Sequence, residues 1–273
     1  SMNISVSGTN RFQGGVRTGE YSIDAGAGGA VIAAGYGAGQ EGGEIVTPAV
    51  DGILAAPRAD LLRAFYGTRL RQALEAGTAF NAALAASTPP TTAFGSDPFS
   101  RNMALIAAVI AARGALGARR QTFFVNYGGW DHHDDVLANM DRMLPAVNAG
   151  LASFRDAMVE LGVHDAVTTF TISDFGRTLT SNGKGSDHGW GGNMMVMGGA
   201  VAGGAIHGSF PDLAPGAPLD TGRGRFIPTT SVDEIHGELA LWFGIPTTEL
   251  ELVVPNLARF WSPGGGPPVG FMA

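Results

Sequence analysis

From Gln121 onward the chain alternates apolar strand patterns with helix patterns, and this alternation constrains its fold most strongly. Strand patterns cover residues 121–127, 166–173 and 193–199, and a long amphipathic pattern after the first strand predicts a helix that ends near Gly162. Strands that alternate with helices favour a mainly parallel sheet with helices on both faces. We therefore expect an α/β fold whose ligand site lies beyond the carboxyl ends of the strands.

Further helices are expected before and after these strands. Apolar residues recur with a helical period over residues 58–86. Asp97 is an expected N-cap with a proline directly after it, and the capping box at residues 231–234 starts a C-terminal helix. Residues 1–57 alternate β-like pieces with glycine clusters and are expected to form strands and loops. At 273 residues we expect a single domain over 1–273, with the site in an α/β core over 58–273.

The composition excludes several classes of protein. Lysine and arginine are few and form no cluster beyond the pair at residues 119–120, so no nucleic acid is expected as a partner. Without cysteine there is no disulfide scaffold and no thiolate zinc site. The longest apolar run, residues 103–112, is about half the ~20 residues of a membrane span, and the first residues lack the basic and apolar regions of a signal peptide. Neither a P-loop nor a Gly-x-Ser-x-Gly motif occurs.

The densest run of ionisable side chains, Asp131-His132-His133-Asp134-Asp135, follows the first strand pattern. Residues at i and i+2 of an extended loop can face the same way, so Asp131 and His133 can share a divalent metal while His132 points elsewhere. Asp134 and Asp135 are better explained by a helix N-terminus, where acidic side chains favour the helix dipole. We predict that Asp131 and His133 are metal ligands.

Two more polar segments lie near the other strand patterns. Asp187 and His188 stand in a loop rich in glycine and serine, where the alternative is an Asx turn with a surface histidine. Together with the Asp131 segment, they are predicted to complete one metal site. Asp174 can bind a metal, and Arg177 can hold a phosphate or sulfate oxygen in fork geometry. A mutual ion pair between Asp174 and Arg177 is the open alternative.

Three segments carry a resemblance to a known family. They are residues 128–133 (GGWDHH), 173–178 (SDFGRT) and 182–191 (NGKGSDHGWG). They resemble family 1501 of the domains of unknown function, which is placed in the alkaline phosphatase and sulfatase superfamily. The resemblance implies an alkaline-phosphatase-like fold, one or two divalent metals (Zn, Mn, Mg or Ca), hydrolysis of phosphate or sulfate esters, and a periplasmic or secreted location.

The resemblance also implies roles for individual residues. Asp131 and His133 correspond to the Asp/His pair of one metal site, and His188 to its later histidine ligand. Phe175 stands where the second site usually has a histidine, which implies one metal, or a weak second one held by Asp174 and Asp187. Members of the family are typically longer and begin with an export signal and a strand near the nucleophile. The resemblance therefore implies a truncated version in which a metal-activated water attacks.

These observations predict a metal-dependent hydrolase of phosphate, sulfate or carboxylic esters on small molecules or polymers. Asp174 and Arg177 are its expected catalytic residues, and Asp131, His133, Asp187 and His188 its expected metal ligands. The alternative is an exported, metal-stabilised binding or structural domain without turnover. An exposed sheet edge would also favour a homo-oligomer.

Overall fold

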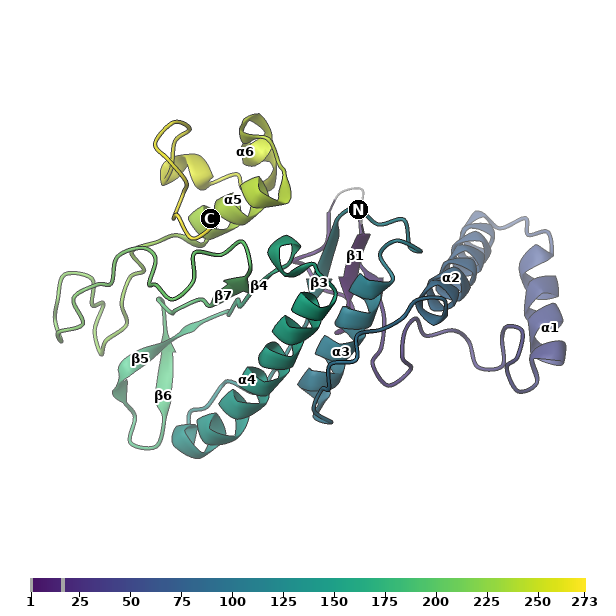
Figure 1. Ribbon diagram of the computed structural model, residues 1–273, viewed down its shortest axis with the longest axis horizontal. Coiled ribbons are helices and arrows are strands. Elements are labelled where there is room, and N and C mark those ends of the chain that lie inside the picture. Colours follow the sequence, from purple (N-terminus) through teal and green to yellow (C-terminus); the bar gives the residue numbers. More distant parts are fainter. Residues whose placement is uncertain (1, 16–17) are drawn as a thin grey trace. The chain divides into compact units, whose positions relative to one another are not determined.

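The computed structural model describes residues 2–15 and 18–273 and is a mixed α/β protein (Figure 1). The chain forms two compact units. The first unit contains the residues up to Tyr127 together with Ala149–Ala157, and the second contains Gly128–Asn148 and Met158–Ala273. The α/β class is thus confirmed, whereas the single domain over 1–273 stays a prediction.

The first unit combines helices with a small parallel sheet. Its elements are α1 (Gly43–Ala55), α2 (Leu61–Ala85), α3 (Pro98–Ala111), β1 (Met2–Ser5), β2 (Tyr21–Ser22) and β3 (Gln121–Phe124). The strand order is β2-β1-β3, and Ile4 of β1 pairs with Phe123 of β3. Ile4 is completely buried, and α3 carries the most buried apolar side chains of any helix in this unit. The longest apolar run of the sequence therefore belongs to the core.

Two parts of the first unit differ from the sequence-based expectations. Residues 43–55, expected to be strand or loop, form α1, which follows Gly42 in the left-handed conformation (φ 73°). The glycine clusters around this segment obscured its helical period. Helix α2 begins as its sequence predicts, with the carboxylate of Asp60 accepting a hydrogen bond from the Arg63 N–H. The apolar side chains that give this helix its period are largely exposed, however: Leu61, Leu62, Phe65, Leu70 and Leu74. Leu61 is 82% exposed, and Leu74 is the one buried member of this set.

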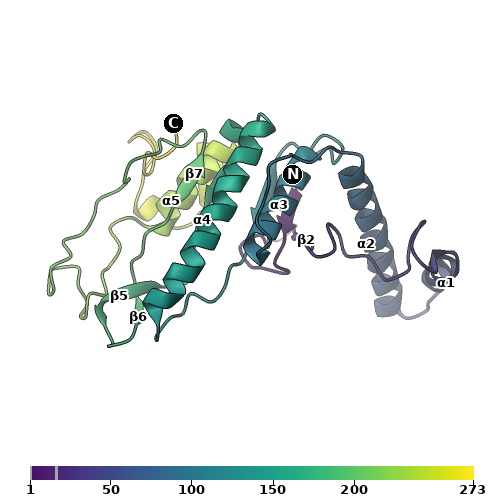
Figure 2. The same cartoon turned by 60° about the horizontal axis from the view of Figure 1, so that its bottom comes forward.

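The second unit contains two separate antiparallel strand pairs. Its elements are part of α4 (Val136–Glu160), β4 (Thr168–Phe170), β5 (Gly176–Ser181), β6 (Ser186–Gly189), β7 (Val196–Gly198), α5 (Val232–Phe243), α6 (Leu250–Val253) and short 3₁₀ turns at His164–Ala166, Thr247–Glu249 and Leu257–Arg259. Strand β4 pairs with β7 (Figure 1), and β5 pairs with β6 (Figures 1 and 2). None of the described helices combines the length and the apolarity of a membrane span.

The mainly parallel sheet predicted from the sequence is therefore wrong for the second unit. Parallel strands need a crossover connection, usually a helix. The chain between β4 and β7 forms the β5–β6 hairpin, and no helix lies within that connection. The hairpin takes the place of the helical crossover that usually joins parallel strands, and β7 lies beside β4 in the antiparallel direction. Among the described strands, parallel pairing is confined to the three strands of the first unit.

One buried carboxylate anchors the end of the chain in the second unit. Glu238 of α5 is 2% exposed and accepts hydrogen bonds from the backbone N–H groups of Val269, Gly270 and Met272, at 2.6 to 2.7 Å. The helix that presents it starts at the predicted capping box, in which Ser231 and Glu234 exchange hydrogen bonds. The C-terminal residues are thus attached to α5 by charge-assisted hydrogen bonds.

Candidate metal centre

The site is built on the β5–β6 hairpin and on the loop that precedes α4, both in the second unit. Residues 186–189, expected to be a loop, form strand β6, in which His188 pairs with Arg177 of β5. The 131–133 segment lies against this hairpin at Gly185. A Cβ at Gly185 would lie 2.4 Å from the backbone oxygen of His133, so only glycine permits this close approach.

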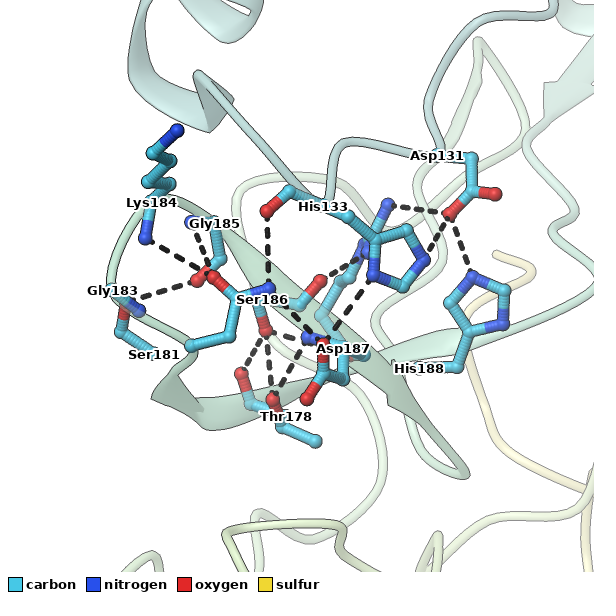
Figure 3. A network of polar contacts seen from close by, with 12 residues as sticks. Asp131, His133, Thr178, Ser181, Gly183, Lys184, Gly185, Ser186, Asp187 and His188 are labelled. Carbon is cyan, nitrogen blue, oxygen red and sulfur yellow. Dashed lines mark hydrogen bonds and ion pairs between the residues drawn. The ribbon is translucent and has the colours of Figure 1, made fainter.

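Asp131, His133 and His188 converge on one point (Figure 3). The Oδ1 atom of Asp131 lies 2.7 Å from Nε2 of His188 and 3.0 Å from Nε2 of His133. One potential ligand atom from each residue lies within 4.8 Å of the others. Two imidazoles and a carboxylate are a donor set that zinc and related divalent metals accept, with three protein ligands and open positions. The structure thus brings together three of the four predicted metal ligands.

The electrostatics of the site keep Asp131 ionised. Its pKa is lowered first by the hydrogen bond with His188, and then by the nearby charges of His133, His188 and Arg177. The Asp131 side chain is 58% exposed, so a metal can reach it from solvent. A carboxylate that is charged well below neutral pH is available as a metal ligand without the loss of a proton.

Phe175 lies flat against His188. The two rings stack with their centroids 3.9 Å apart and their planes 7° apart, and the guanidinium carbon of Arg177 lies 5.0 Å from the centre of the Phe175 ring. The sequence indicated only that Phe175 replaces a histidine ligand. Its contact with His188 was missed, because nothing in the sequence pairs residues 175 and 188 until β5 and β6 are known to form a hairpin.

Asp187, the fourth predicted ligand, contacts a different set of groups. Its Oδ1 lies 3.4 Å from Nδ1 of His133 and accepts a hydrogen bond from Asn182 at 3.1 Å, and its Oδ2 lies 2.6 Å from Nη1 of Arg223. The pKa of Asp187 is lowered, first by the bond from Asn182 and then by that from Arg223. Sequence reasoning also missed Arg223, whose backbone has φ 64° between two glycines.

Arg177 of the hairpin contacts the loop that carries Asp131 and His133. Its Nη2 donates to the backbone oxygen of Trp130 at 2.6 Å and lies 3.3 Å from Oδ1 of Asp131, while Nη1 donates to the backbone oxygen of Ser186. The alternative ion pair with Asp174 does not form. In the described part of the chain, Asp174 is exposed and makes no side-chain hydrogen bond or ion pair.

His132 is 7% exposed, in contrast to its half-exposed neighbour His133. It is not part of the triad, in agreement with the predicted i and i+2 arrangement of the ligands. Its Nε2 atom is buried and has no hydrogen-bond partner among the described residues. Asp134 and Asp135 are exposed and precede the first turn of α4, as a helix N-terminus would place them.

Comparison with known proteins identifies a family and nothing closer. Searches of curated proteins and of solved structures give no match. A family profile described as "Protein of unknown function (DUF1501)" matches residues 57–250. Because this match covers most of the chain, including every residue of the candidate metal centre, the protein belongs to the DUF1501 family.

Proposed function

We propose that the protein is a metal-dependent ester hydrolase with an alkaline-phosphatase-like ancestry, acting outside the cytoplasm. The observation that carries this proposal is the convergence of Asp131, His133 and His188 on one point. Asp131, His133 and His188 would hold a divalent metal, which would supply Lewis acidity and lower the pKa of a bound water when present. The three side chains leave coordination positions open for substrate and water, as catalytic rather than structural metal sites do.

The charge balance of the site favours an anionic ester. Asp131 and Asp187 carry two negative charges, and their ion-pair partners Arg177 and Arg223 carry two positive charges. These four charges cancel, so a bound divalent cation leaves the site positive. Phosphate and sulfate esters are attracted to such a site more strongly than neutral carboxylic esters. We therefore rank phosphate and sulfate esters as its substrates ahead of carboxylic esters.

The protein's own side chains position the reactants. Arg177 holds Asp131 in place through Nη2, and its positive charge faces the same point as the three ligand atoms, where it stabilises an anionic ester. Arg223 adds a second guanidinium whose side chain is 48% exposed. Asp174 is an exposed carboxylate two residues before the start of β5 and is proposed to accept a proton during the reaction or to support a second metal ion.

A second function, a metal-stabilised binding or structural domain without turnover, is favoured by one observation. The side chains of Asp131, His133 and His188 are each 47–58% exposed, so the triad lies open to solvent. Enzyme active sites usually shield the reacting atoms from bulk solvent. In this second function, the metal holds the loop before α4 and the β5–β6 hairpin together and takes no part in a reaction.

Hydrolysis of chromogenic esters tests the first function. Nitrophenyl phosphate, sulfate and acetate are each incubated with the protein and with zinc, manganese, magnesium or calcium. Metal-dependent hydrolysis that is lost in Asp131→Ala and in His188→Ala, but kept in the neighbouring Asp134→Ala, supports the hydrolase. Turnover that survives both ligand substitutions contradicts it.

Thermal unfolding with and without a chelator separates the two functions. A large fall in Tm on metal removal, with no turnover of any ester, supports the structural domain. If the purified protein binds none of the four metals, both functions are wrong.

A further inference from the structure

We propose that Asp187 is a positioning residue that fixes the ring of His133 for metal binding, and that Arg223 and Asn182 hold Asp187 in that role. This inference rests on the proposed metal site and replaces the sequence-based prediction that Asp187 is itself a ligand. It is carried by the contacts of the His133 ring and of the two Asp187 oxygen atoms.

The two nitrogen atoms of the His133 ring face different carboxylates. Nε2 lies 3.0 Å from Asp131 Oδ1, within the triad, and Nδ1 lies 3.4 Å from Asp187 Oδ1. A neutral imidazole has one protonated and one unprotonated nitrogen, and a metal binds the unprotonated one. Because Nε2 faces the triad, we assign the proton to Nδ1, which then donates a hydrogen bond to Oδ1 of Asp187. A carboxylate in this place orients the ring and makes Nε2 a stronger ligand.

The oxygen atoms of Asp187 are already engaged. Oδ1 also accepts a hydrogen bond from Asn182, and Oδ2 lies 2.6 Å from the Arg223 guanidinium. Both oxygen atoms of Asp187 are thus held by groups outside the triad, and turning either one toward a metal would break these contacts. Asp131 differs, because its contacts with His133, His188 and Arg177 are all made through Oδ1. Asp187 is accordingly absent from the triad of converging ligand atoms.

The residues that hold Asp187 are themselves fixed. Asn182 donates from the same Nδ2 atom to the backbone oxygen of His133, at 3.0 Å, so it aligns Asp187 with His133. Arg223 has φ 64°, a conformation that non-glycine residues keep only where the surrounding structure requires it. Asp220 accepts hydrogen bonds from the N–H groups of Gly222 and Gly224, at 2.8 and 2.9 Å, and so stabilises the turn on both sides of Arg223.

Zinc titration of the intact protein tests the affinity part of this proposal. Asp187→Asn should raise the zinc Kd about 10- to 100-fold, as loss of a carboxylate behind a histidine ligand does. Asp187→Glu should restore part of the affinity. Asp134→Asn is the control. Asp134 is the neighbour of His133 in the sequence but contacts no histidine, so removing its negative charge should change the zinc Kd little. An equal effect of Asp134→Asn and Asp187→Asn would show that only net charge matters and would overturn the proposal.

Nitrogen NMR of histidine-labelled, zinc-loaded protein tests the geometric part. In the wild type, His133 should carry its proton on Nδ1, and Asp187→Asn should shift that signal or broaden it by exchange. A proton on Nε2 of His133, or a signal unchanged by Asp187→Asn, would overturn the proposal. If zinc binds with the expected tautomer but no ester is hydrolysed, the proposed hydrolase alone is wrong. If the wild type binds no zinc, both the proposed hydrolase and the positioning role of Asp187 are wrong.

Discussion

At the scale of single residues, the stack of Phe175 on His188 gives a direct prediction. Phe175→Ala removes the ring that fixes the plane of His188. Aromatic pairs contribute about 0.5–1.5 kcal/mol beyond their buried area, so we expect the zinc Kd to rise roughly 2- to 10-fold. Zinc titration measures this change. Phe210→Ala, which removes a 56% exposed phenylalanine elsewhere in the second unit, should leave Kd unchanged. An equal Kd for wild type and Phe175→Ala would show that the stack does not orient the ligand.

The predicted ligand residues differ in how far the sequence could identify their places in the structure. The i and i+2 spacing of Asp131 and His133 is a local property, and the structure brings both residues to the triad. Asp187 and His188 were expected in a loop, where both side chains could reach a metal. In strand β6, successive side chains point in different directions, so His188 contacts Asp131 while Asp187 contacts Arg223. The contacts of Asp187 depend on this strand and could not be predicted without it.

At the scale of elements, the contact between Gly185 and the ligand loop can be tested. A Cβ at residue 185 would lie 2.4 and 2.7 Å from the backbone oxygens of His133 and His132. Gly185→Ala must therefore displace this loop, and we expect a loss of about 1–3 kcal/mol in unfolding free energy together with weaker zinc binding. Urea unfolding and zinc titration measure the two effects. Gly192→Ala, whose Cβ would meet its nearest atom at 3.8 Å, is the control. Wild-type zinc affinity in Gly185→Ala would contradict the close approach.

The hairpin that carries Gly185 was not predictable from local sequence. Strands are recognised by alternating apolar and polar residues, and residues 176–189 are almost entirely polar or glycine. The hairpin is stabilised instead by specific polar contacts, such as the hydrogen bond between the Thr178 and Ser186 hydroxyl groups. Such contacts depend on the register of the two strands and leave no periodic signal. The capping box at Ser231, by contrast, is a local signal and was confirmed.

The loop that presents Arg223 should be sensitive to acid. The pKa of Asp220 is lowered, first by the N–H of Gly216 and also by those of Gly222 and Gly224. A carboxyl group whose pKa is lowered by folding stabilises the folded state at pH values above its pKa in the unfolded chain, which is 3.8. This stabilisation is lost as the pH falls below 3.8 and through the lower pKa of the folded state. The urea midpoint of the wild type should therefore fall further between about pH 5 and about pH 3 than that of Asp220→Asn. Equal falls in both proteins would contradict this prediction.

At the scale of the whole molecule, the sequence identified the mixture of helices and strands but not the pairing of the strands. A strand pattern shows that a segment is extended and leaves its partner open. β1 and β3, about 120 residues apart in sequence, pair in parallel, whereas β4 and β7, much closer together, pair antiparallel. The direction of pairing depends on the path of the entire connection between two strands, and no local sequence pattern encodes that path.

The attachment of the C-terminal residues to α5 gives a prediction for the stability of the second unit. Glu238→Gln keeps the shape of the side chain but places an amide N–H₂ against backbone N–H donors, so at least one buried donor loses its acceptor. A hydrogen bond to a charged group contributes about 1.5–3 kcal/mol, so we expect a loss of about 2 kcal/mol or more. Urea unfolding measures it, with the exposed Glu251→Gln as control. Glu238 is distant in sequence from the triad and forms none of its contacts. The zinc affinity of the folded Glu238→Gln protein should therefore match that of the wild type. A large fall in affinity would mean that the C-terminal attachment also supports the metal centre.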